Sequence, residues 1–224
     1  MKFEHTEVFN FEGALRGMRN PLNSWAKSDS EIVWNYGEVP HYEIGLNDMN
    51  LARRLIAGGT EHRKFLRQIM VSVDITAPLY WWKEFDTYKV GTTANSTSTM
   101  HKLASTPITK ECFEMGDFED VAVEKVYNQN SEFLFEYSTD DFVGDIIESL
   151  ECLRRRYNET SDKRYWKELV RWLPNGWLQT RTVTMNYENL RSMYHQREHH
   201  KLVEWHAFCD WVKTLPYAEE FIID

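Results

Sequence analysis

The chain has 224 residues, 42% apolar and 14% aromatic, which is enough to bury the core of one large domain or two small ones. Its formal net charge of −9 argues against sequence-independent binding of DNA or RNA. No stretch approaches the roughly 18 uncharged apolar residues of a membrane span, and the N-terminus lacks the apolar run of a signal peptide. We therefore expect a cytoplasmic protein that has neither nucleic acid nor a membrane as a partner.

The first third of the chain predicts a helix followed by a strand. The first forty residues mix Gly, Pro, Asn and Ser with single apolar residues, and predict loops with a short helix. The pair Asn47-Asp48 predicts the cap of a helix that stops at Gly58-Gly59. Apolar and polar residues alternate from Gln68 to Thr76, which predicts a strand with one buried face. We expect Ala77-Pro78 to end it.

A loop rich in hydroxyl groups, residues 86–101, is the most informative segment. Leu79 to Phe85 is aromatic and predicts the opening of a helix that leads into the loop. Small hydroxyl residues surround Asn95, in a stretch too polar for a core and too compact for a linker. This composition indicates hydrogen bonds to a phosphorylated or heteroaromatic ligand. In the alternative interpretation, the Thr and Ser side chains only satisfy turns.

The second half predicts three helices and one strand. The first helix, Asp141 to Tyr157, has one apolar face formed by Phe142, Ile146, Leu150 and Leu153. The other expected elements are a helix from Asp162 to Trp172, a strand from Thr180 to Met185 and one long helix from Glu188 to Lys213. Because no break in composition marks a boundary, we predict an α+β fold in which residues 1–224 form a single, helix-dominated domain with a small, mainly antiparallel sheet.

The sequence lacks the usual motifs of nucleophilic and metal catalysis. Cys112, Cys152 and Cys209 have no CxxC spacing, which predicts reduced thiols. We expect Cys152 and Cys209 to be core residues, because apolar residues flank both in predicted helices. The spacing of His195 and His199 suits a metal ion, but no acidic residue completes a recognised pattern, so no metal site is predicted.

Asn186 and Arg197 form a second candidate segment. Asn186 lies where a predicted strand gives way to a helix, a place where a side-chain amide and exposed backbone N–H groups can meet a ligand. Arg197 lies three helical turns further on, and its rigid fork suits a phosphate or the carbonyl pair of a pyrimidine. Alternatively, Asn186 only caps the helix and Arg197 makes a surface ion pair.

The order of these segments resembles that of the flavin-dependent thymidylate synthases over about residues 47–216. Thr60-Glu61-His62 resembles the family's His-containing FAD segment, and the strand to Ile75 resembles the strand that follows it. Ala77-Pro78-Leu79 resembles the Ala-Pro start of the next helix.

The remaining motifs follow in the same order. Lys89 to His101 occupies the place of the signature, which is Arg-His-Arg followed by seven residues and Ser. Leu173-Pro174, the strand from Thr180 to Asn186 and the helix through Arg197 resemble the family's Leu-Pro, Thr and Asn-to-Arg segments, with matching spacing.

The resemblance implies a reductive methylation that converts dUMP to dTMP. In that family FAD is reduced by a nicotinamide cofactor, here expected to be NADPH, and methylenetetrahydrofolate supplies the methylene group. The flavin carries the difficult chemistry while the protein positions the rings and tunes charge. The resemblance also implies a homotetramer with FAD and dUMP at the subunit junctions.

Site residues follow from the resemblance by position. Those expected to bind FAD are His62, Lys89, Asn95 and Asn186. Ser98 and Arg197 are expected to hold dUMP and to serve catalysis, and Arg171 to reach the dUMP phosphate.

The signature itself is altered. Depending on the placement of one gap, Thr87-Tyr88-Lys89 or Tyr88-Lys89-Val90 stands in place of Arg-His-Arg, and Ser96 and Met100 replace a Glu and an Arg. A lysine supplies a point charge without a bidentate fork. Lost charged hydrogen bonds contribute roughly 1.5–3 kcal/mol each, which weakens binding by orders of magnitude unless neighbours such as His101 and Lys102 compensate.

Three hypotheses remain open from the sequence. The chain is an active enzyme that methylates dUMP, a divergent flavoenzyme that acts on another pyrimidine nucleotide or transfers another one-carbon unit, or a non-catalytic relative that binds a nucleotide or a partner protein.

Overall fold

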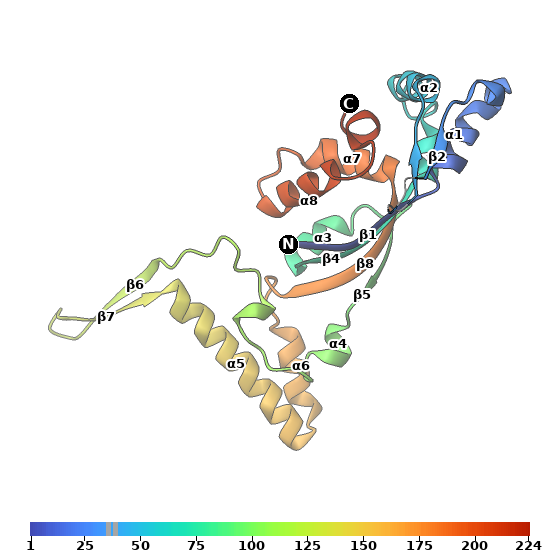
Figure 1. Cartoon of the computed structure of the whole chain (residues 1–224). Coiled ribbons are helices and arrows are strands. Elements are labelled where there is room, and N and C mark those ends of the chain that lie inside the picture. Colours follow the sequence, from blue (N-terminus) through green and yellow to red (C-terminus); the bar gives the residue numbers. More distant parts are fainter. Residues whose placement is uncertain (35–36, 38–39) are drawn as a thin grey trace. The chain divides into compact units, whose positions relative to one another are not determined.

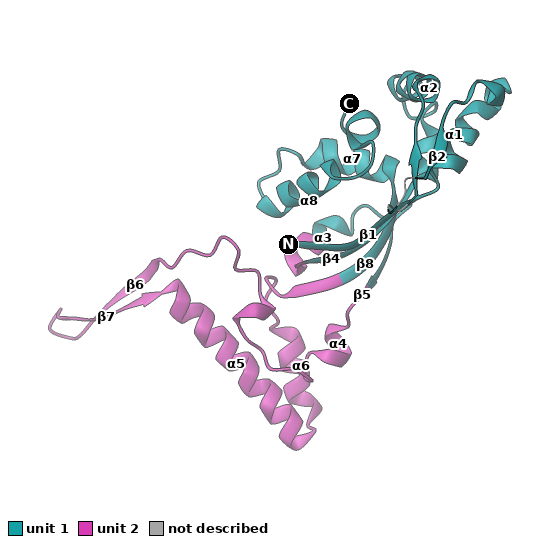
Figure 2. Ribbon diagram, viewed as in Figure 1, with its two compact units in different colours: residues 1–76, 83–95, 181–224 teal, residues 77–82, 96–180 magenta. Residues whose placement is uncertain are grey.

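The structure, a computed structural model, describes residues 1–34, 37 and 40–224. It has the predicted α+β fold of helices and small antiparallel sheets. The chain divides into two compact units (Figure 2): unit 1 comprises residues 1–76, 83–95 and 181–224, and unit 2 comprises residues 77–82 and 96–180. That residues 1–224 form a single domain stays a prediction. None of the described helices is long and apolar enough to cross a membrane.

The main sheet has the strand order β1-β4-β8-β5 (Figure 1). Its strands are β1 (Lys2–Phe9), β4 (Met70–Pro78), β8 (Leu178–Asn186) and β5 (Thr93–Ser96). Val71, Val73 and Ile75 of β4 are fully or almost fully buried, which confirms the strand and buried face predicted from alternation. The strand continues through Ala77-Pro78, which were expected to end it.

The first forty residues hold more structure than loops with a short helix. Besides the expected helix, α1 (Phe11–Arg19), they form β1, which pairs antiparallel with β4 and places Val8 beside Val71. The pattern of β1 does not alternate cleanly, so its pairing partner rather than its own sequence sets it as a strand. The short elements that follow are η1 (Asn20–Leu22), η2 (Trp25–Lys27) and β2 (Glu31–Val33), which pairs with β3 (His41–Glu43). Residues 35, 36, 38 and 39 of this stretch lie outside the described residues.

Helix α2 (Leu46–Ala57) confirms the helix predicted before Gly58-Gly59, but its expected cap was wrong. Gly45 is the N-cap residue, and the Asp29 carboxylate caps the helix from outside by accepting hydrogen bonds from the Asn47 and Asp48 N–H groups at 2.9 and 3.1 Å. Asp48 lies instead in the first turn, fully buried, where its carboxylate accepts a hydrogen bond from Arg19 Nε at 2.5 Å. Since Asp29 caps α2, the Asp48 side chain is left to compensate the charge of the buried Arg19 of α1.

The long helix predicted from Glu188 to Lys213 was wrong, because two helices occupy this stretch. They are α7 (Tyr187–Arg197) and α8 (Val203–Lys213). Between them, His200 Nδ1 accepts a hydrogen bond from the Leu202 N–H at 3.2 Å, and the His200 carbonyl lies 2.7 Å from His206 Nε2. These side-chain contacts give the backbone partners outside the helical pattern, which favours a break. The break still leaves Trp205 and Phe208 fully buried.

The remaining helical turns of unit 1 are η3 (Lys64–Gln68) and η5 (Glu219–Ile223). η3 includes Gln68, which was predicted to begin the strand, and packs against α1 and α7. Phe65 of η3 and Phe221 of η5 meet edge to face, with ring centroids 5.7 Å apart. Both rings are buried, so these short turns close the core of unit 1.

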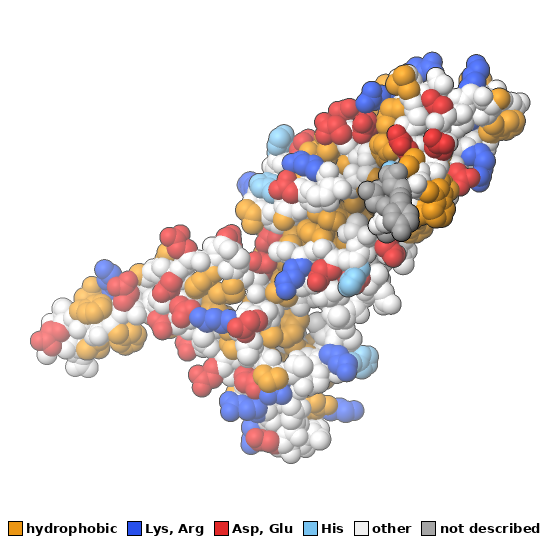
Figure 3. Space-filling view, in the orientation of Figure 1, with side chains coloured by type: hydrophobic (Ala, Val, Ile, Leu, Met, Phe, Trp, Pro, Cys, Tyr) orange, Lys and Arg blue, Asp and Glu red, His pale blue; other side chains and the backbone are white. Residues whose placement is uncertain are grey.

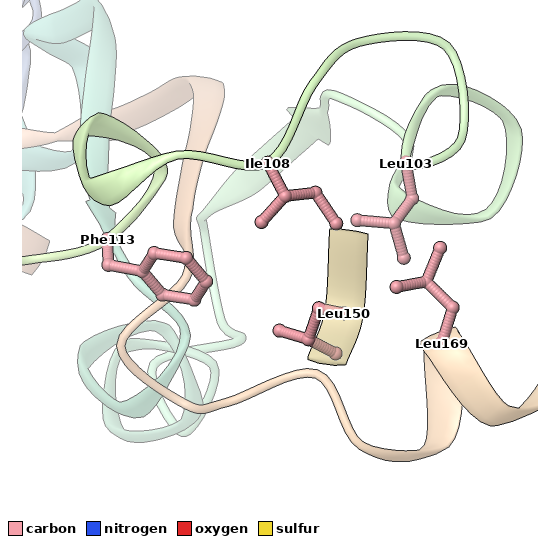
Figure 4. Packing of buried hydrophobic residues seen from close by; sticks show 5 residues of the cluster. All are labelled: Leu103, Ile108, Phe113, Leu150 and Leu169. Carbon is pink, nitrogen blue, oxygen red and sulfur yellow. The ribbon is translucent and has the colours of Figure 1, made fainter. Parts of the chain in front are cut away.

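Unit 2 has its own small core (Figure 4). Its elements are the first residues of α3 (Leu79–Phe85), α4 (Thr99–Lys102), η4 (Lys110–Cys112), β6 (Ala122–Tyr127), β7 (Phe133–Ser138), α5 (Thr139–Thr160) and α6 (Lys163–Arg171). The helices confirm those predicted for residues 79–85, 141–157 and 162–172. Figure 4 shows five core side chains that point toward one another: Leu103, Ile108, Phe113, Leu150 and Leu169.

The hairpin of β6 and β7 was not predicted. Three consecutive apolar residues, Phe133-Leu134-Phe135, hide the alternation that would indicate a strand. Helix α5 begins directly after β7 with a capping box between Ser138 and Asp141. Its predicted apolar face is buried only in part, because Leu150 is buried while Phe142 is 51% exposed.

Candidate functional site

The turn between α3 and β5 packs on the start of α7. Residues 83–95, which include this turn, belong to unit 1, as does α7. Asn189 Nδ2 donates a hydrogen bond to the Val90 carbonyl at 2.7 Å. Gly91 has a φ of +76°, and a Cβ there would lie 2.9 Å from Asn189 Oδ1 and 3.0 Å from Asn186 Nδ2. Only glycine meets both conditions without strain, so the turn is shaped to lie against these two amides.

Asn186 is the N-cap of α7, as one of the two interpretations of the sequence predicts. Its Oδ1 accepts from the Asn189 N–H at 2.9 Å, and Asn189 Oδ1 accepts from the Asn186 N–H at 3.2 Å. The Asn186 side chain is 8% exposed. Its Nδ2 donates no hydrogen bond to any described residue. The cap therefore uses the acceptor of this amide and leaves its donor for another group.

Two polar groups of the turn itself are also uncommitted. Thr92 Oγ1 is buried and has no hydrogen-bond partner among the described residues. Lys89 is exposed and makes no ion pair within the described part of the chain. Because a buried polar group without a partner costs about 1–3 kcal/mol, such a group is expected to meet a ligand or water. An ammonium and a hydroxyl on this turn, with an amide donor at the start of α7 beside it, fit an anionic ligand with hydrogen-bond acceptors.

Arg197 lies at the end of α7 and is held by α3 and the turn after it. Its Nη1 donates to Glu84 Oε2 at 3.0 Å, and its Nε donates to the Tyr88 hydroxyl at 2.8 Å. The guanidinium carbon lies 4.7 Å from the Trp205 ring centroid and 5.5 Å from that of Tyr88. The Arg197 guanidinium thus lies against two aromatic rings, and the Glu84 carboxylate already accepts one of its hydrogen bonds.

Several hydrogen-bond donors contact the Glu84 carboxylate beside Arg197. Besides Arg197, Trp205 Nε1 donates to Glu84 Oε2 at 2.9 Å, and His200 Nε2 lies 3.4 Å from the same oxygen. The side chains of Arg197 and Glu84 are 19% and 34% exposed. Sequence reasoning missed Glu84, because 113 residues separate it from Arg197 and nothing local indicates the contact. We call Glu84, Tyr88, Arg197, His200 and Trp205 the Arg197 cluster.

His62 lies on the loop after α2 and is exposed. Its ring packs on Gly58, where a Cβ would lie 3.1 Å from His62 Cδ2. The next residue, Arg63, makes a bidentate pair with Glu188 in the first turn of α7, at 2.9 and 3.0 Å. The loop that carries His62 is therefore anchored to the helix that Asn186 caps, through a contact between residues 125 apart that the sequence did not reveal.

A cavity of about 480 Å³ in unit 1 has His62 on its edge. Phe65 and Leu55 line its apolar part, and Lys64 and Gln68 contribute polar groups. Its size is within the roughly 300–1,000 Å³ of small-molecule sites.

The remaining predicted residues are described within their own units. Asn95 is exposed in β5 of unit 1, and its side chain has no hydrogen bond to the described residues. Ser98 belongs to unit 2, where it caps α4: its Oγ accepts from the His101 N–H at 3.1 Å and lies 2.9 Å from His101 Nδ1. Arg171, also in unit 2, ends α6, is half exposed and pairs with Glu168.

The predictions for the cysteines are confirmed only in part. Cys209 is buried as predicted, and burial raises the pKa of its thiol to about 11, so it is not a thiolate nucleophile at neutral pH. Cys152 was expected in the core but is exposed on α5. His195 lies 3.9 Å from Glu198, and no group of three side chains suited to a metal ion occurs among the described residues.

No family model and no curated protein matches this sequence. Its fold, in contrast, is that of the flavin-dependent thymidylate synthases. Over 99% of this chain and 98% of the other, it is similar to flavin-dependent thymidylate synthase ThyX from Helicobacter pylori complexed with FAD and dUMP, with a TM-score of 0.67 and 16% identity. A second structure of that protein with FAD and dUMP gives a TM-score of 0.65, also at 16% identity, over 100% and 98% of the two chains.

The same fold also matches a methylase with another substrate range. This is the UMP/dUMP methylase PolB from Streptomyces cacaoi bound with 5-Br UMP, with a TM-score of 0.58 and 12% identity over 98% of this chain and 94% of the other. At such identities the similarity establishes the fold, including the order of elements that the sequence resemblance implied, but not the substrate.

Proposed function

We propose that this protein is a flavin-dependent methylase of a pyrimidine nucleotide, and that its reaction converts dUMP to dTMP with methylenetetrahydrofolate and NADPH. The observation that carries the proposal is the whole-chain similarity in fold to structures holding FAD and dUMP. The uncommitted donors of the turn that packs on α7 support it from this chain's own residues.

FAD would be held at the turn between α3 and β5. Lys89 would supply positive charge, Asn186 Nδ2 and Thr92 Oγ1 would supply hydrogen bonds, and His62 and Asn95 would complete the set. When bound, the flavin supplies the reducing chemistry that no side chain of this protein provides. Gly91 lets the backbone lie close to the amides, and Asn189 fixes that approach through the Val90 carbonyl.

Arg197 would bind and orient the nucleotide. Its stacking on Trp205 and Tyr88 fixes the plane of the guanidinium, so its remaining donors face one direction. Glu84 keeps the charge of Arg197 compensated until an anionic ligand competes for it. Ser98 and Arg171 of unit 2 stay in the proposal as groups that hold dUMP and its phosphate.

A second candidate is methylation of another pyrimidine nucleotide, UMP above all. The match to a UMP/dUMP methylase favours it, as does the replacement of the two signature arginines. The non-catalytic alternative is favoured by the loss of the same two arginines and by the engagement of Arg197 by Glu84 and Tyr88. The proposal also includes a homotetramer and a cytoplasmic location, with neither nucleic acid nor a membrane as a partner.

The test is product analysis with the full chain. The protein is loaded with FAD and incubated with NADPH, methylenetetrahydrofolate and either dUMP, UMP or dCMP, and the nucleotides are separated by mass. We expect one added methyl group on dUMP, and its loss in Arg197→Lys but not in Arg53→Ala, which removes a half-exposed arginine of unit 1. Methylation of UMP in preference to dUMP selects the second candidate, and FAD-loaded protein that methylates none of the three excludes both.

A further inference from the structure

The carboxylate of Glu84 is oriented by donors that all face one of its two oxygens. Arg197 Nη1 and Trp205 Nε1 donate to Oε2 at 3.0 and 2.9 Å. His200 Nδ1 accepts from the Leu202 N–H, so the neutral ring carries its hydrogen on Nε2, which lies 3.4 Å from the same Oε2. Oε1 has no hydrogen-bond partner within the described part of the chain. Glu84, whose side chain is 34% exposed, therefore presents one free acceptor.

Only part of the Arg197 fork is committed. Its Nε donates to the Tyr88 hydroxyl at 2.8 Å, and that hydroxyl donates in turn to Gln196 Oε1 at 3.1 Å. Nη1 gives one of its two hydrogens to Glu84. Nη2 makes no hydrogen bond to the residues that the structure describes, so Nη2 and the second hydrogen of Nη1 are free. Arg197 and Glu84 thus offer free donors next to a free acceptor.

Among pyrimidines, the edge of cytosine complements this arrangement. Its base-pairing edge carries an amino donor on C4 and then two acceptors, N3 and O2. Because the amino group lies at the end of that edge, it can meet Glu84 while both acceptors face Arg197. Uracil carries its donor, the N3–H, between two carbonyl oxygens. When that donor meets Glu84, one carbonyl oxygen can face Arg197, but the other lies beside a carboxylate, which only accepts.

We propose that the Arg197 cluster binds the base of a cytosine nucleotide, dCMP, in preference to that of dUMP. Glu84 Oε1 accepts from the 4-amino group, and Arg197 donates to N3 and O2. A carboxylate that accepts from the cytosine amino group and an arginine fork that meets two acceptors are recurring base contacts. The inference rests on the proposed function, in which Arg197 orients the nucleotide. It adds dCMP to the nucleotides of that site, and dUMP binds there with fewer contacts.

A comparison of dCMP with dUMP isolates the contribution of the base. Both nucleotides carry the same deoxyribose and the same 5′-phosphate. The chain has a net charge of −9, and Figure 3 shows its Asp and Glu side chains spread over the face in view. The resulting repulsion of an anionic ligand lowers both affinities alike, so it cancels in the ratio of the two dissociation constants.

The test is titration calorimetry of the full chain with dCMP and with dUMP, in the presence of FAD. We expect the wild type to bind dCMP more tightly by about tenfold, and Glu84→Gln to lose that preference, because the amide can also donate to a carbonyl oxygen. The matched control is Glu220→Gln, which removes a carboxylate 3.6 Å from Arg53 and should leave the ratio unchanged. If Glu84 had only a structural role, its loss would weaken both nucleotides equally. Circular dichroism verifies that each variant is folded.

A third nucleotide tests the contact with the amino group itself. The 5′-monophosphate of 2-pyrimidinone deoxyriboside has a hydrogen in place of the 4-amino group and keeps N3 and O2. We expect it to bind the wild type about tenfold more weakly than dCMP, and most of this difference to disappear in Glu84→Gln. A wild type that prefers dUMP, or a ratio that Glu84→Gln leaves unchanged, would overturn the inference and leave the proposed function intact. A folded protein that binds none of the three nucleotides would overturn both.

Discussion

Two arginine–carboxylate pairs in unit 1 are built in opposite ways. Arg19 and Asp48 are 4% and 0% exposed, whereas Arg197 and Glu84 are 19% and 34% exposed. Asp48 also accepts hydrogen bonds from Ser28 Oγ at 2.7 Å and Ser30 Oγ at 2.6 Å. The buried pair is enclosed by its own polar shell, while the other pair lies under aromatic rings and reaches solvent.

This difference in burial indicates that the buried pair stabilises the fold, whereas the partly exposed pair can exchange partners. Breaking a buried pair leaves a charge without compensation, which is strongly unfavourable. A pair in contact with water costs little to open, because water solvates both ions. We therefore propose that Arg19 and Asp48 stabilise the fold and that Arg197 and Glu84 serve ligand binding, and the predictions below test this proposal.

The largest expected effect is that of Asp48→Asn. It leaves the Arg19 guanidinium buried without a counter-ion, and its Nη2 already lacks a partner among the described residues. We expect the free energy of unfolding in urea to fall by about 3–5 kcal/mol. The matched control is Glu12→Gln, whose carboxylate pairs with Arg16 at the surface and should contribute about 0–1 kcal/mol. A loss below that of the control would contradict the assignment.

Arg197→Lys should weaken nucleotide binding without unfolding the protein. The lysine keeps a charge but loses the fork that meets Glu84 and Tyr88. Charged hydrogen bonds contribute about 1.5–3 kcal/mol, so the dissociation constant of dUMP should rise about 10- to 100-fold. Titration calorimetry measures the affinity, and urea unfolding measures stability. Unchanged affinity, or lost stability comparable with that of Asp48→Asn, would place Arg197 in the fold instead.

Gly91→Ala should strain the turn that packs on α7. A left-handed conformation costs a residue with a Cβ about 1–2 kcal/mol, and the new atom would also press on Asn186 and Asn189. The matched control is Gly144→Ala in α5, where a Cβ meets nothing within 4 Å. That change should stabilise the protein by up to about 1 kcal/mol, because alanine favours helix. Equal effects at both positions would argue against a tight turn.

Glu84→Gln should have a small effect on dUMP binding, opposite in sign to that of Arg197→Lys. It removes the carboxylate that competes with an anionic ligand for Arg197. Since partly exposed ion pairs contribute about 0–1 kcal/mol, we expect dUMP binding to tighten by about fivefold or less. Weaker binding in the same titration would show that Glu84 contacts the nucleotide itself.

The smallest expected effect is on stability in acid. Burial acts to raise the pKa of Asp48, but hydrogen bonds from Ser28, Ser30 and Arg19 outweigh it, so the pKa lies below the ordinary 3.8. The stabilisation from this carboxylate is then complete above pH 3.8 and is lost as the pH falls through the lower folded-state value. Unfolding measured from pH 6 downward should show this loss in the wild type and not in Asp48→Asn, and identical slopes would refute it.

The sequence predicts elements better than contacts. Alternation gave β4, and the spacing of apolar residues gave α5, because these signals are local. Strand β1 and the hairpin β6–β7 lack such alternation, and the break at His200 depends on side chains that bond to the backbone. Prediction misses the elements whose conformation is set by contacts with other parts of the chain rather than by a pattern in their own sequence.

The candidate site, likewise, could be predicted from the sequence only in part. A resemblance in motif order was enough to indicate Asn186 and Arg197, which the structure places at the two ends of α7. It could not indicate Glu84 or the pair of Arg63 with Glu188, because folding joins these residues over 113 and 125 positions of sequence. No local pattern carries that information.

Flavin binding is the central claim, and the visible absorbance spectrum of the full chain tests it most directly. The protein is incubated with FAD, freed of unbound FAD on a desalting column and then titrated with dUMP. We predict a yellow protein that retains the flavin bands through the column, with bands that shift as dUMP binds. A folded protein that leaves the column colourless, and whose spectrum dUMP does not change, would contradict the account.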